Sequence, residues 1–180
     1  KVIIFDFDGV IINSHEVQVK SLETAYRKVV GSGEIPYDDF FHLSGDSLEN
    51  IFTKLNLPNK MVSIYQAYSS KNIGLIKLHD NMANILEYIK QEDVYCALCT
   101  GKERVRTMEI LRYFNMEKYF KIIVCSDDVT APKPNAESVL VVMQELGVQK
   151  GDCIMVGDGI NDIKCAYNAG IKAIAVAWGD

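Results

Sequence analysis

The sequence has little that would direct it to a membrane or to nucleic acid. No apolar run approaches the roughly 18 residues that a membrane span requires. There is no long run of Lys and Arg, and the formal net charge of −5 argues against a surface for nucleic acid or anionic lipid. Internal repeats and low-complexity segments are also missing. The 180 residues, 48% hydrophobic and 24% charged, predict a soluble globular protein with one core, or a core plus a small inserted domain.

Disulfides are not expected, although the chain contains five cysteines: Cys96, Cys99, Cys125, Cys153 and Cys165. Their odd number and apolar surroundings favour reduced thiols in a cytoplasmic protein. Cys96 and Cys99 have the spacing of a redox or zinc motif, but they stand in a run that predicts a strand over 94–99. Residues three apart in a strand face opposite sides at roughly 10 Å, which is too far for a disulfide. We therefore expect buried structural thiols.

Apolar runs predict strands that alternate with helices along most of the chain. The strands are expected over 2–5, 94–99, 121–125, 153–156 and 173–177. This alternation predicts an α/β fold, in which a parallel sheet has helices on both faces. The segment 13–79 differs, because its apolar residues recur only with the spacing of helices, beginning at Asn13 or Ser14, near Ser47 and near Lys60. It is therefore expected to be an all-helical insertion between two pieces of a core, 1–12 and 80–180.

Polar residues follow the predicted strands, at the edge of the sheet where function gathers in folds of this kind. Asp6 and Asp8 come directly after the first strand, and side chains two apart in an extended chain point the same way, roughly 7 Å apart. Adjacent carboxylates repel each other and resist desolvation, and a divalent cation such as Mg²⁺ relieves both problems. The later strands are followed by Thr100, Gly101, Lys102, Lys133, Asp158 and Asp162.

These residue types are the parts needed for phosphoryl transfer. Asp6 is placed to act as a nucleophile that forms an aspartyl-phosphate, and Asp8 to exchange a proton with the leaving oxygen and with water. Asp158 adds a third carboxylate and favours bound Mg²⁺. Thr100 offers a hydroxyl to phosphate oxygens, and Lys133, held between two prolines, can neutralise both Asp6 and the transferring group.

Each of these features has a plainer interpretation when taken alone. Thr100 could be a helix cap, Lys133 a solvated loop lysine, and residues 157–162 a turn rich in residues that tolerate positive φ. The two aspartates could simply end a strand. Their occurrence together, in order and at strand ends, favours the catalytic interpretation.

The motifs resemble those of the haloacid dehalogenase superfamily. The resemblance rests on Asp6-Phe7-Asp8-Gly9-Val10, Thr100-Gly101, Lys133-Pro134 and Gly157-Asp158-Gly159-Ile160-Asn161-Asp162. The insertion after the first motif is similar to the cap of the branch that contains phosphoglycolate phosphatase and β-phosphoglucomutase. The resemblance implies a Rossmann-like, three-layer core and Mg²⁺ held by Asp6, the backbone carbonyl of Asp8 and Asp158, with Asp162 supporting them. Because members of this branch usually continue past the fifth strand, the chain is expected to be incomplete.

The resemblance also predicts where substrate binds. Residues 43–47 resemble the substrate-facing loop of the cap, so His42, Ser44 and Gly45 are candidate substrate ligands, together with Gly101 and Lys102 of the core. Ser44 stands where the mutases carry a lysine, which leaves the identity of the substrate open.

The function expected from the sequence is a Mg²⁺-dependent phosphatase for a small phosphomonoester of the phosphoglycolate or sugar-phosphate type. A sugar phosphomutase is the alternative. A dehalogenase needs no metal, so Asp8 and Asp158 argue against it. A silent binding module needs no catalytic residues, and the intact set of Asp6, Asp8, Lys133 and Asp158 argues against it. No nucleic-acid or membrane partner is expected. The sequence leaves the oligomeric state open, and a monomer is compatible with it.

Overall fold

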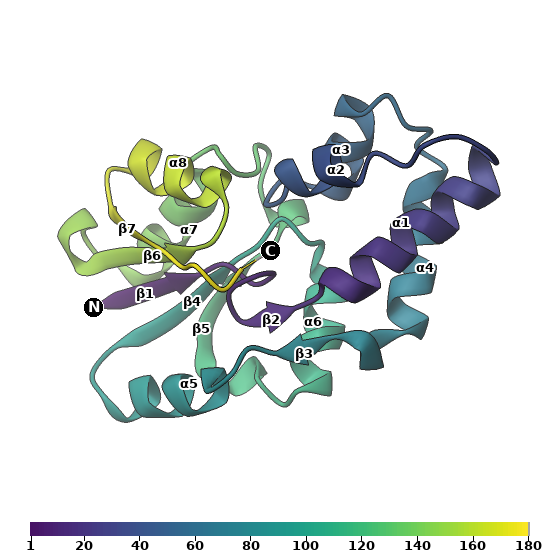
Figure 1. Ribbon diagram of the computed structural model, residues 1–180. Helices are drawn as coiled ribbons and strands as arrows, with labels where there is room; N and C mark the ends of the chain where they lie inside the picture. Colours follow the sequence, from purple (N-terminus) through teal and green to yellow (C-terminus); the bar gives the residue numbers. More distant parts are fainter. Residues whose placement is uncertain (180) are drawn as a thin grey trace.

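A parallel sheet forms the centre of the larger part of the molecule (Figure 1). The computed structural model describes residues 1–179, so Asp180, the last residue of the predicted core, lies outside the described residues. The strands of this sheet are β1 (Val2–Phe5), β4 (Tyr95–Cys99), β5 (Phe120–Val124), β6 (Cys153–Gly157) and β7 (Lys172–Ala175). Their order is β5-β4-β1-β6-β7, and every neighbouring pair is parallel. The predicted α/β fold with a Rossmann-like parallel sheet is therefore confirmed.

The central strand β1 packs against helices on both faces of the sheet. Val2 and Ile4 belong to a hydrophobic cluster that includes residues of α7 and α8, whereas Phe5 and Phe7 belong to a second cluster with residues of α5 and α6. This division follows from the alternation of side chains along a strand. The helices of the core are α5 (Met82–Gln91), α6 (Arg104–Tyr113), α7 (Glu137–Leu146) and α8 (Ile160–Ala169). The result is the expected arrangement of three layers.

The order of the strands determines where a ligand can bind. After β1 the chain continues to β4 and β5 on one side, and then crosses to β6 and β7 on the other. The connections from β1 and from β6 therefore diverge at their carboxyl ends. Crevices at such a switch point are the usual ligand sites of open parallel sheets.

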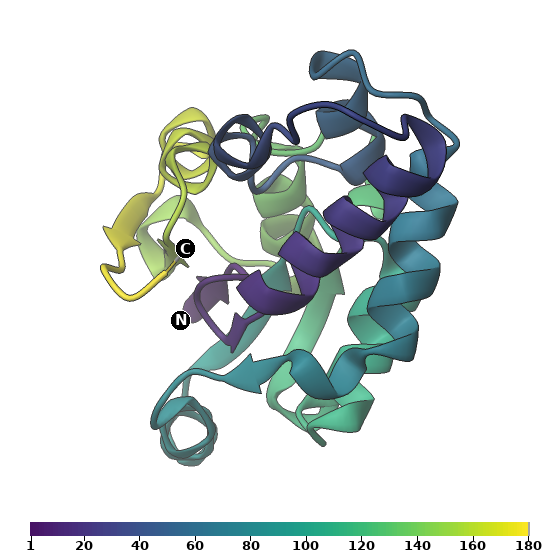
Figure 2. The same ribbon diagram turned by 45° about the vertical axis from the view of Figure 1, so that its right-hand side comes forward.

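The inserted segment forms a second, helical part with its own hydrophobic core, which we call the cap. Its helices are α1 (His15–Val29), α2 (Tyr37–His42), α3 (Leu48–Lys54) and α4 (Met61–Lys71). Helices α1 and α4 lie side by side in both views (Figures 1 and 2). The buried side chains of this core, among them Leu22, Phe40, Phe52 and Met61, all come from residues 22–65. The boundaries predicted for the two parts remain a proposal.

Two features of the cap were not predicted. Helix α2 has only six residues, which is too short to show a helical repeat, and it is fixed by Phe40, whose side chain is buried in the cap core. The description all-helical also needs a correction, because β2 (Ile12–Asn13) pairs antiparallel with β3 (Lys77–Leu78) where the chain leaves and re-enters the core. Strands of two residues carry no alternation that a sequence pattern could reveal.

Short 3₁₀ helices complete the chain: η1 (Ile73–Leu75), η2 (Glu117–Tyr119), η3 (Ser126–Asp128) and η4 (Lys150–Asp152). Other local predictions agree with the structure. Ser47 caps α3 by accepting a hydrogen bond from the Asn50 backbone N–H, and Gly147 ends α7 in the left-handed conformation.

None of the helices within residues 1–179 is both long enough and apolar enough to span a membrane.

The five cysteines are free and buried, as the sequence predicts. Burial raises the pKa of Cys96 to about 11 and that of Cys125 to about 12, so both side chains are neutral thiols at pH 7. Neither has the thiolate character that a nucleophile requires.

The separate core of the cap leads to a prediction about stability. Phe52 is fully buried at the centre of the cap, so Phe52→Ala should lower the free energy of unfolding by about 3–5 kcal/mol, through lost burial and a residual cavity. Chemical denaturation followed by circular dichroism measures this value. Tyr88→Ala is the control, because Tyr88 is 64% exposed on α5 and its truncation should change stability by less than about 0.5 kcal/mol. Equal effects of the two substitutions would show that Phe52 has no anchoring role.

Candidate active site

A cavity of about 70 Å³ lies between the carboxyl ends of the strands and the cap. On the core side it is lined by residues that follow β1, β4 and β6, which is the switch point of the sheet. The cap side of the cavity is lined by Phe40, Leu48, Ile51, Tyr65, Gln66 and Ser69, together with the loop 44–46. Most of the residues singled out in the sequence analysis therefore line one cavity.

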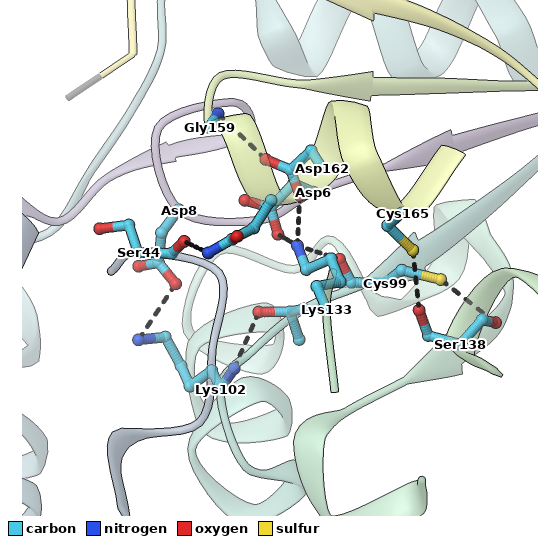
Figure 3. Close-up of polar contacts among 12 residues, drawn as sticks. Asp6, Asp8, Ser44, Cys99, Lys102, Lys133, Ser138, Gly159, Asp162 and Cys165 are labelled. Atoms are coloured by element: carbon cyan, nitrogen blue, oxygen red, sulfur yellow. Dashed lines mark hydrogen bonds and ion pairs between the residues drawn. The ribbon is translucent and has the colours of Figure 1, made fainter. Parts of the chain in front are cut away.

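A buried lysine joins two carboxylates at the base of this cavity. Lys133 is 2% exposed, and its Nζ lies 2.6 Å from Oδ1 of Asp6 and 2.5 Å from Oδ1 of Asp162 (Figure 3). The same ammonium group donates to the backbone carbonyl of Cys99 at 3.2 Å. Its three donors are thus directed to residues that follow or end β1, β4 and β6. Lys133 is not a solvated loop lysine.

The electrostatics of this group reflect its burial. Burial raises the pKa of Asp6 well above the ordinary value, the nearby carboxylate of Asp162 raises it further, and Lys133 only partly opposes them. Burial alone would lower the pKa of Lys133, but Asp162 and Asp6 together raise it, so the ammonium stays charged. The single ammonium group of Lys133 thus offsets only part of the negative charge of the nearby carboxylates, and the site carries an excess of negative charge.

This excess and the donor atoms present fit a hard divalent cation. Carboxylate oxygens of Asp6, Asp158 and Asp162 all lie within 4.8 Å of one another. Mg²⁺ prefers oxygen ligands and offsets the repulsion between carboxylates. The side chain of Asp8 does not belong to this group. Its backbone carbonyl is the ligand that the family resemblance implies.

Glycine makes room for Asp158. Gly9 has φ +75°, and a Cβ atom at this position would lie 1.9 Å from Oδ2 of Asp158. A Cβ atom at Gly179 would lie 2.3 Å from the same oxygen. Any side chain at Gly9 would therefore be strained and would also displace Asp158. The glycine of the first motif is required by this close approach.

The Asp8 carboxylate is held by contacts on both of its oxygens. The chain leaves β1 at Phe5 and turns, so Asp8 lies in a loop instead of an extended strand. Ser14 Oγ donates to Oδ1 at 2.5 Å, with Gln18 Nε2 at 3.4 Å from the same oxygen. On the other side, Lys102 Nζ lies 3.2 Å from Oδ2 (Figure 3). The Ser14 hydroxyl, considered as a helix cap in the sequence analysis, is directed to Asp8 and makes no capping hydrogen bond.

The loop after β4 brings the second motif to the cavity. Thr100 is 5% exposed, and its Oγ1 accepts a hydrogen bond from the Lys102 backbone N–H at 3.1 Å. It is not the cap of α6, whose N-cap residue is Glu103. The Thr100 hydroxyl hydrogen therefore remains available to a ligand.

The cap loop lies directly against the core. A Cβ atom at Gly101 would lie 2.5 Å from the backbone oxygens of Gly45 and Asp46, so this approach requires glycine. The carbonyl of Ser44 accepts a hydrogen bond from Asn161 Nδ2 at 2.9 Å. Ser44, Gly45, Gly101 and Lys102 all line the cavity. His42 is exposed and lies outside the lining, so we do not retain it as a substrate ligand.

The carboxylate of Asp46, in the cap loop, is paired with side chains of the cap. Its Oδ2 accepts from Lys54 Nζ at 2.6 Å, and its Oδ1 accepts from Asn50 Nδ2 at 2.9 Å. The carboxylate is therefore neutralised inside the cap. Lys54 stands too far along the chain from Asp46 for the loop pattern to reveal this pair.

Sequence analysis missed several residues of the cavity. The missed residues that line it are Gln18, Tyr65, Gln66, Glu103 and Arg106; Ser14, which donates to Asp8, lies outside the lining. Ser14 and Gln18 are four apart and close to the first motif, so their placement on one helix face offered a signal. Tyr65 and Arg106 offered none, because each falls in a helical pattern that is explained equally well by packing.

Comparison with known proteins agrees with this geometry. The chain is 29% identical, over 184 residues, to the pyrophosphatase PpaX of Halalkalibacterium halodurans, covering 98% of this chain and 83% of the relative. A structure described as a predicted phosphatase from Clostridium acetobutylicum superposes with a TM-score of 0.86 at 24% identity, covering 99% of this chain and 85% of that one. A predicted phosphoglycolate phosphatase from Haemophilus somnus gives 0.86 at 20% identity, covering 99% and 86%.

The two structural matches show the shared fold. The family model described as haloacid dehalogenase-like hydrolase matches residues 3–176, which is nearly the whole chain, and this range includes all the residues that line the cavity. The chain belongs to the haloacid dehalogenase-like hydrolases.

Proposed function

We propose that the chain is a Mg²⁺-dependent phosphatase that hydrolyses a small phosphomonoester through an aspartyl-phosphate on Asp6. The observation that carries this proposal is the contact of Asp6 with the ammonium group of Lys133 at 2.6 Å, in a cluster with the carboxylates of Asp158 and Asp162. The names of relatives, pyrophosphatase and phosphoglycolate phosphatase, support phosphate chemistry as well.

The cation would be held by Asp6 and Asp158, with the backbone carbonyl of Asp8, and Asp162 would orient Lys133 beside it. When bound, Mg²⁺ supplies positive charge that draws the phosphate to Asp6 and offsets the charge of the transition state. Gly159 N–H donates to Oδ2 of Asp162 at 3.1 Å, which fixes this carboxylate at the start of α8. The aspartates thus have separate tasks.

The first step transfers the phosphoryl group. A carboxylate oxygen of Asp6 forms a bond to phosphorus, the bond to the leaving oxygen breaks, and the carboxyl group of Asp8 gives its proton to that oxygen. Lys133 and the Thr100 hydroxyl stabilise the phosphate oxygens. Contacts from Ser14 and Lys102 keep Asp8 in place during the transfer.

The second step releases phosphate. Asp8 takes a proton from water as the water oxygen bonds to phosphorus, and the bond between phosphorus and Asp6 breaks. The enzyme then returns to its starting state. Release of inorganic phosphate from a panel of phosphomonoesters and pyrophosphate, with and without Mg²⁺, tests the proposal as a whole.

A phosphomutase would use the same first step but needs a cationic group for a second phosphate. Among residues 1–179, the cations that line the cavity are Lys102 and Arg106, and each is paired with a carboxylate, Asp8 and Glu109 respectively. Lys54 is paired with Asp46. This pairing favours hydrolysis over mutase activity.

The first prediction concerns the nucleophile. Asp6→Asn should lower kcat by ~10³-fold or more, because the amide keeps the shape of the side chain but cannot attack phosphorus. Steady-state phosphate release measures the loss. Asp39→Asn, at an exposed position of α2, is the matched control and should leave kcat unchanged. A variant at Asp6 that retained more than about a tenth of wild-type kcat would exclude Asp6 as the nucleophile.

The second prediction concerns the metal. Asp158→Asn should weaken Mg²⁺ binding by about tenfold or more, since it removes one charged ligand from a cluster of three carboxylates. The same change should raise the melting temperature in EDTA, because a repelling charge is gone. Calorimetric titration with MgCl₂ and melting with and without EDTA provide both readouts. An unchanged Mg²⁺ affinity would remove Asp158 from the site.

The third prediction separates the two candidate reactions. Incubation with a sugar 1-phosphate and a trace of the sugar bisphosphate should release inorganic phosphate faster than it forms the sugar 6-phosphate, because the cavity offers no unpaired cation for a second phosphate among the described residues. Quantifying both products over time decides between them. Faster formation of the 6-phosphate would support the mutase instead.

A further inference from the structure

Two contacts between the cap and the core border the cavity, and they differ in chemistry. At one contact, the C-terminal turn of α4 lies against α6. At the other, loop 44–46 of the cap lies against Gly101 and Asn161 of the core. Residues of both contacts line the cavity, so the way in which a ligand reaches it depends on which contact separates.

A buried guanidinium group joins the two helices at the first contact. Arg106 of α6 is 3% exposed, and its Nη2 donates to the backbone carbonyl of Ser69 at 2.6 Å. Ser69 lies in the last turn of α4, where carbonyl groups lack a partner within the helix and the helix dipole favours a positive charge. The core thus supplies the positive charge at the end of a helix that belongs to the cap.

Glu109 of α6 strengthens this contact. Its Oε2 accepts hydrogen bonds from Arg106 Nη1 at 2.6 Å and from the Ser70 hydroxyl of α4 at 2.9 Å. Arg106 Nε is buried without a hydrogen-bond partner among residues 1–179, a cost that an apolar side chain would avoid. A charged group kept at this cost indicates that the contact fixes the orientation of α4 relative to α6.

The second contact is neutral. Asn161 Nδ2 donates to the carbonyl of Ser44 at 2.9 Å, and the backbone of loop 44–46 packs on Gly101. Hydrogen bonds with a charged partner are roughly twice as strong as neutral ones, and the first contact has two of them across the boundary, Arg106 to Ser69 and Ser70 to Glu109. The loop therefore separates from the core more easily than α4 separates from α6.

The positions of the two contacts along the chain act in the same direction. Ser69 and Ser70 come shortly before β3, which is one of the two linkers to the core. Loop 44–46 lies midway between the linkers β2 and β3. A rotation of the cap about a point near its linkers consequently moves the loop farther than the end of α4.

We propose that Arg106 is a positioning residue that fixes the end of α4 to α6 and makes this contact the pivot of the cap, so that the cavity opens at loop 44–46. Tyr65, Gln66 and Ser69, which line the cavity from α4, then keep their places while the loop moves away from the core. Ligands enter and leave past the loop. The effect of Arg106 on turnover rests on the proposed phosphatase activity, whereas the pivot itself does not.

Two pairs of nitroxide labels on introduced cysteines test the pivot directly, since the five native cysteines are buried. Glu49→Cys of α3 with Tyr167→Cys of α8 forms the loop-side pair. Ala67→Cys of α4 with Val105→Cys of α6 forms the pivot pair, and all four positions are exposed. In pulsed electron paramagnetic resonance, the loop-side pair should give a distance distribution at least about twice as wide as the pivot pair, because only the loop side moves.

The same measurement on Arg106→Met tests the residue itself. Methionine fills much of the space of arginine but donates no hydrogen bond, so the distribution of the pivot pair should broaden to that of the loop-side pair. Equal widths of the two pairs in the wild-type background would overturn the pivot. A pivot pair that is unchanged by Arg106→Met would show that Arg106 does not hold it.

Hydrolysis of p-nitrophenyl phosphate with MgCl₂ connects the pivot with turnover. Arg106→Met should raise KM by about tenfold and change kcat by less than about threefold, because the wall on α4 shifts while the catalytic residues of the core stay in place. Arg106→Lys should restore KM to within about threefold, since an ammonium group can also donate to the carbonyl of Ser69. An unchanged KM in Arg106→Met, a loss confined to kcat, or no rescue by lysine would contradict a positioning role.

Arg112→Met is the matched control. Arg112 also lies on α6, but its side chain is 67% exposed and its partner is Glu117 of the core, so KM and both label distributions should stay unchanged. If circular dichroism shows that Arg106→Met does not fold, Ser70→Ala replaces it, because this variant removes one of the two charged contacts and should raise KM by about threefold. An unchanged KM and an unchanged pivot pair in Ser70→Ala would then overturn the proposal. Absence of hydrolysis by the wild-type protein would contradict the phosphatase activity, and the label distances would still decide the pivot.

Discussion

The contact of one buried ammonium group with two carboxylates is the interaction on which the arrangement of the site depends. Parallel strands place the residues that follow β1 and β6 at the same edge, so Asp6, Asp158 and Asp162 crowd together. Such crowding is unfavourable in a buried place unless positive charge accompanies it. Lys133 brings that charge from a loop beyond β5, and its contacts also reach the end of β4 through the carbonyl of Cys99.

The loop that carries Lys133 is itself held in position. The Glu137 carboxylate, at the start of α7, accepts hydrogen bonds from the backbone N–H groups of Thr130 and Ala131 and from the Thr130 hydroxyl. The loop is therefore tied to the first turn of a helix whose other residues pack on the sheet. The position of one ammonium group thus follows from the packing of a whole layer. The packing of α7 on the sheet therefore holds the Lys133 loop, and with it the ammonium group, in place.

Much of the fold could be predicted from the sequence, because the signals are local. The apolar run of β1, the alternation of strands and helices after residue 80, and Ser47 at the start of α3 each depend on neighbours in the chain. The order of the candidate catalytic residues along the chain could also be predicted, since each comes after a strand. The rest depends on contacts that the local pattern does not show. The partner of Asp46 is Lys54 and the partner of Arg106 is the carbonyl of Ser69, and no spacing in the sequence indicates either of them.

The β2–β3 ladder has a consequence for how the cap can move. Two linkers join the core to the cap, one at β2 and one at β3. The linkers pair with each other, Ile12 with Leu78 and Asn13 with Lys77. Because the two linkers are hydrogen-bonded to each other, they must bend together, and the ladder resists a twist of one linker relative to the other. Any opening of the cap must therefore bend both linkers together, and it must also break contacts across the cavity, such as the hydrogen bond from Asn161 Nδ2 to the carbonyl of Ser44.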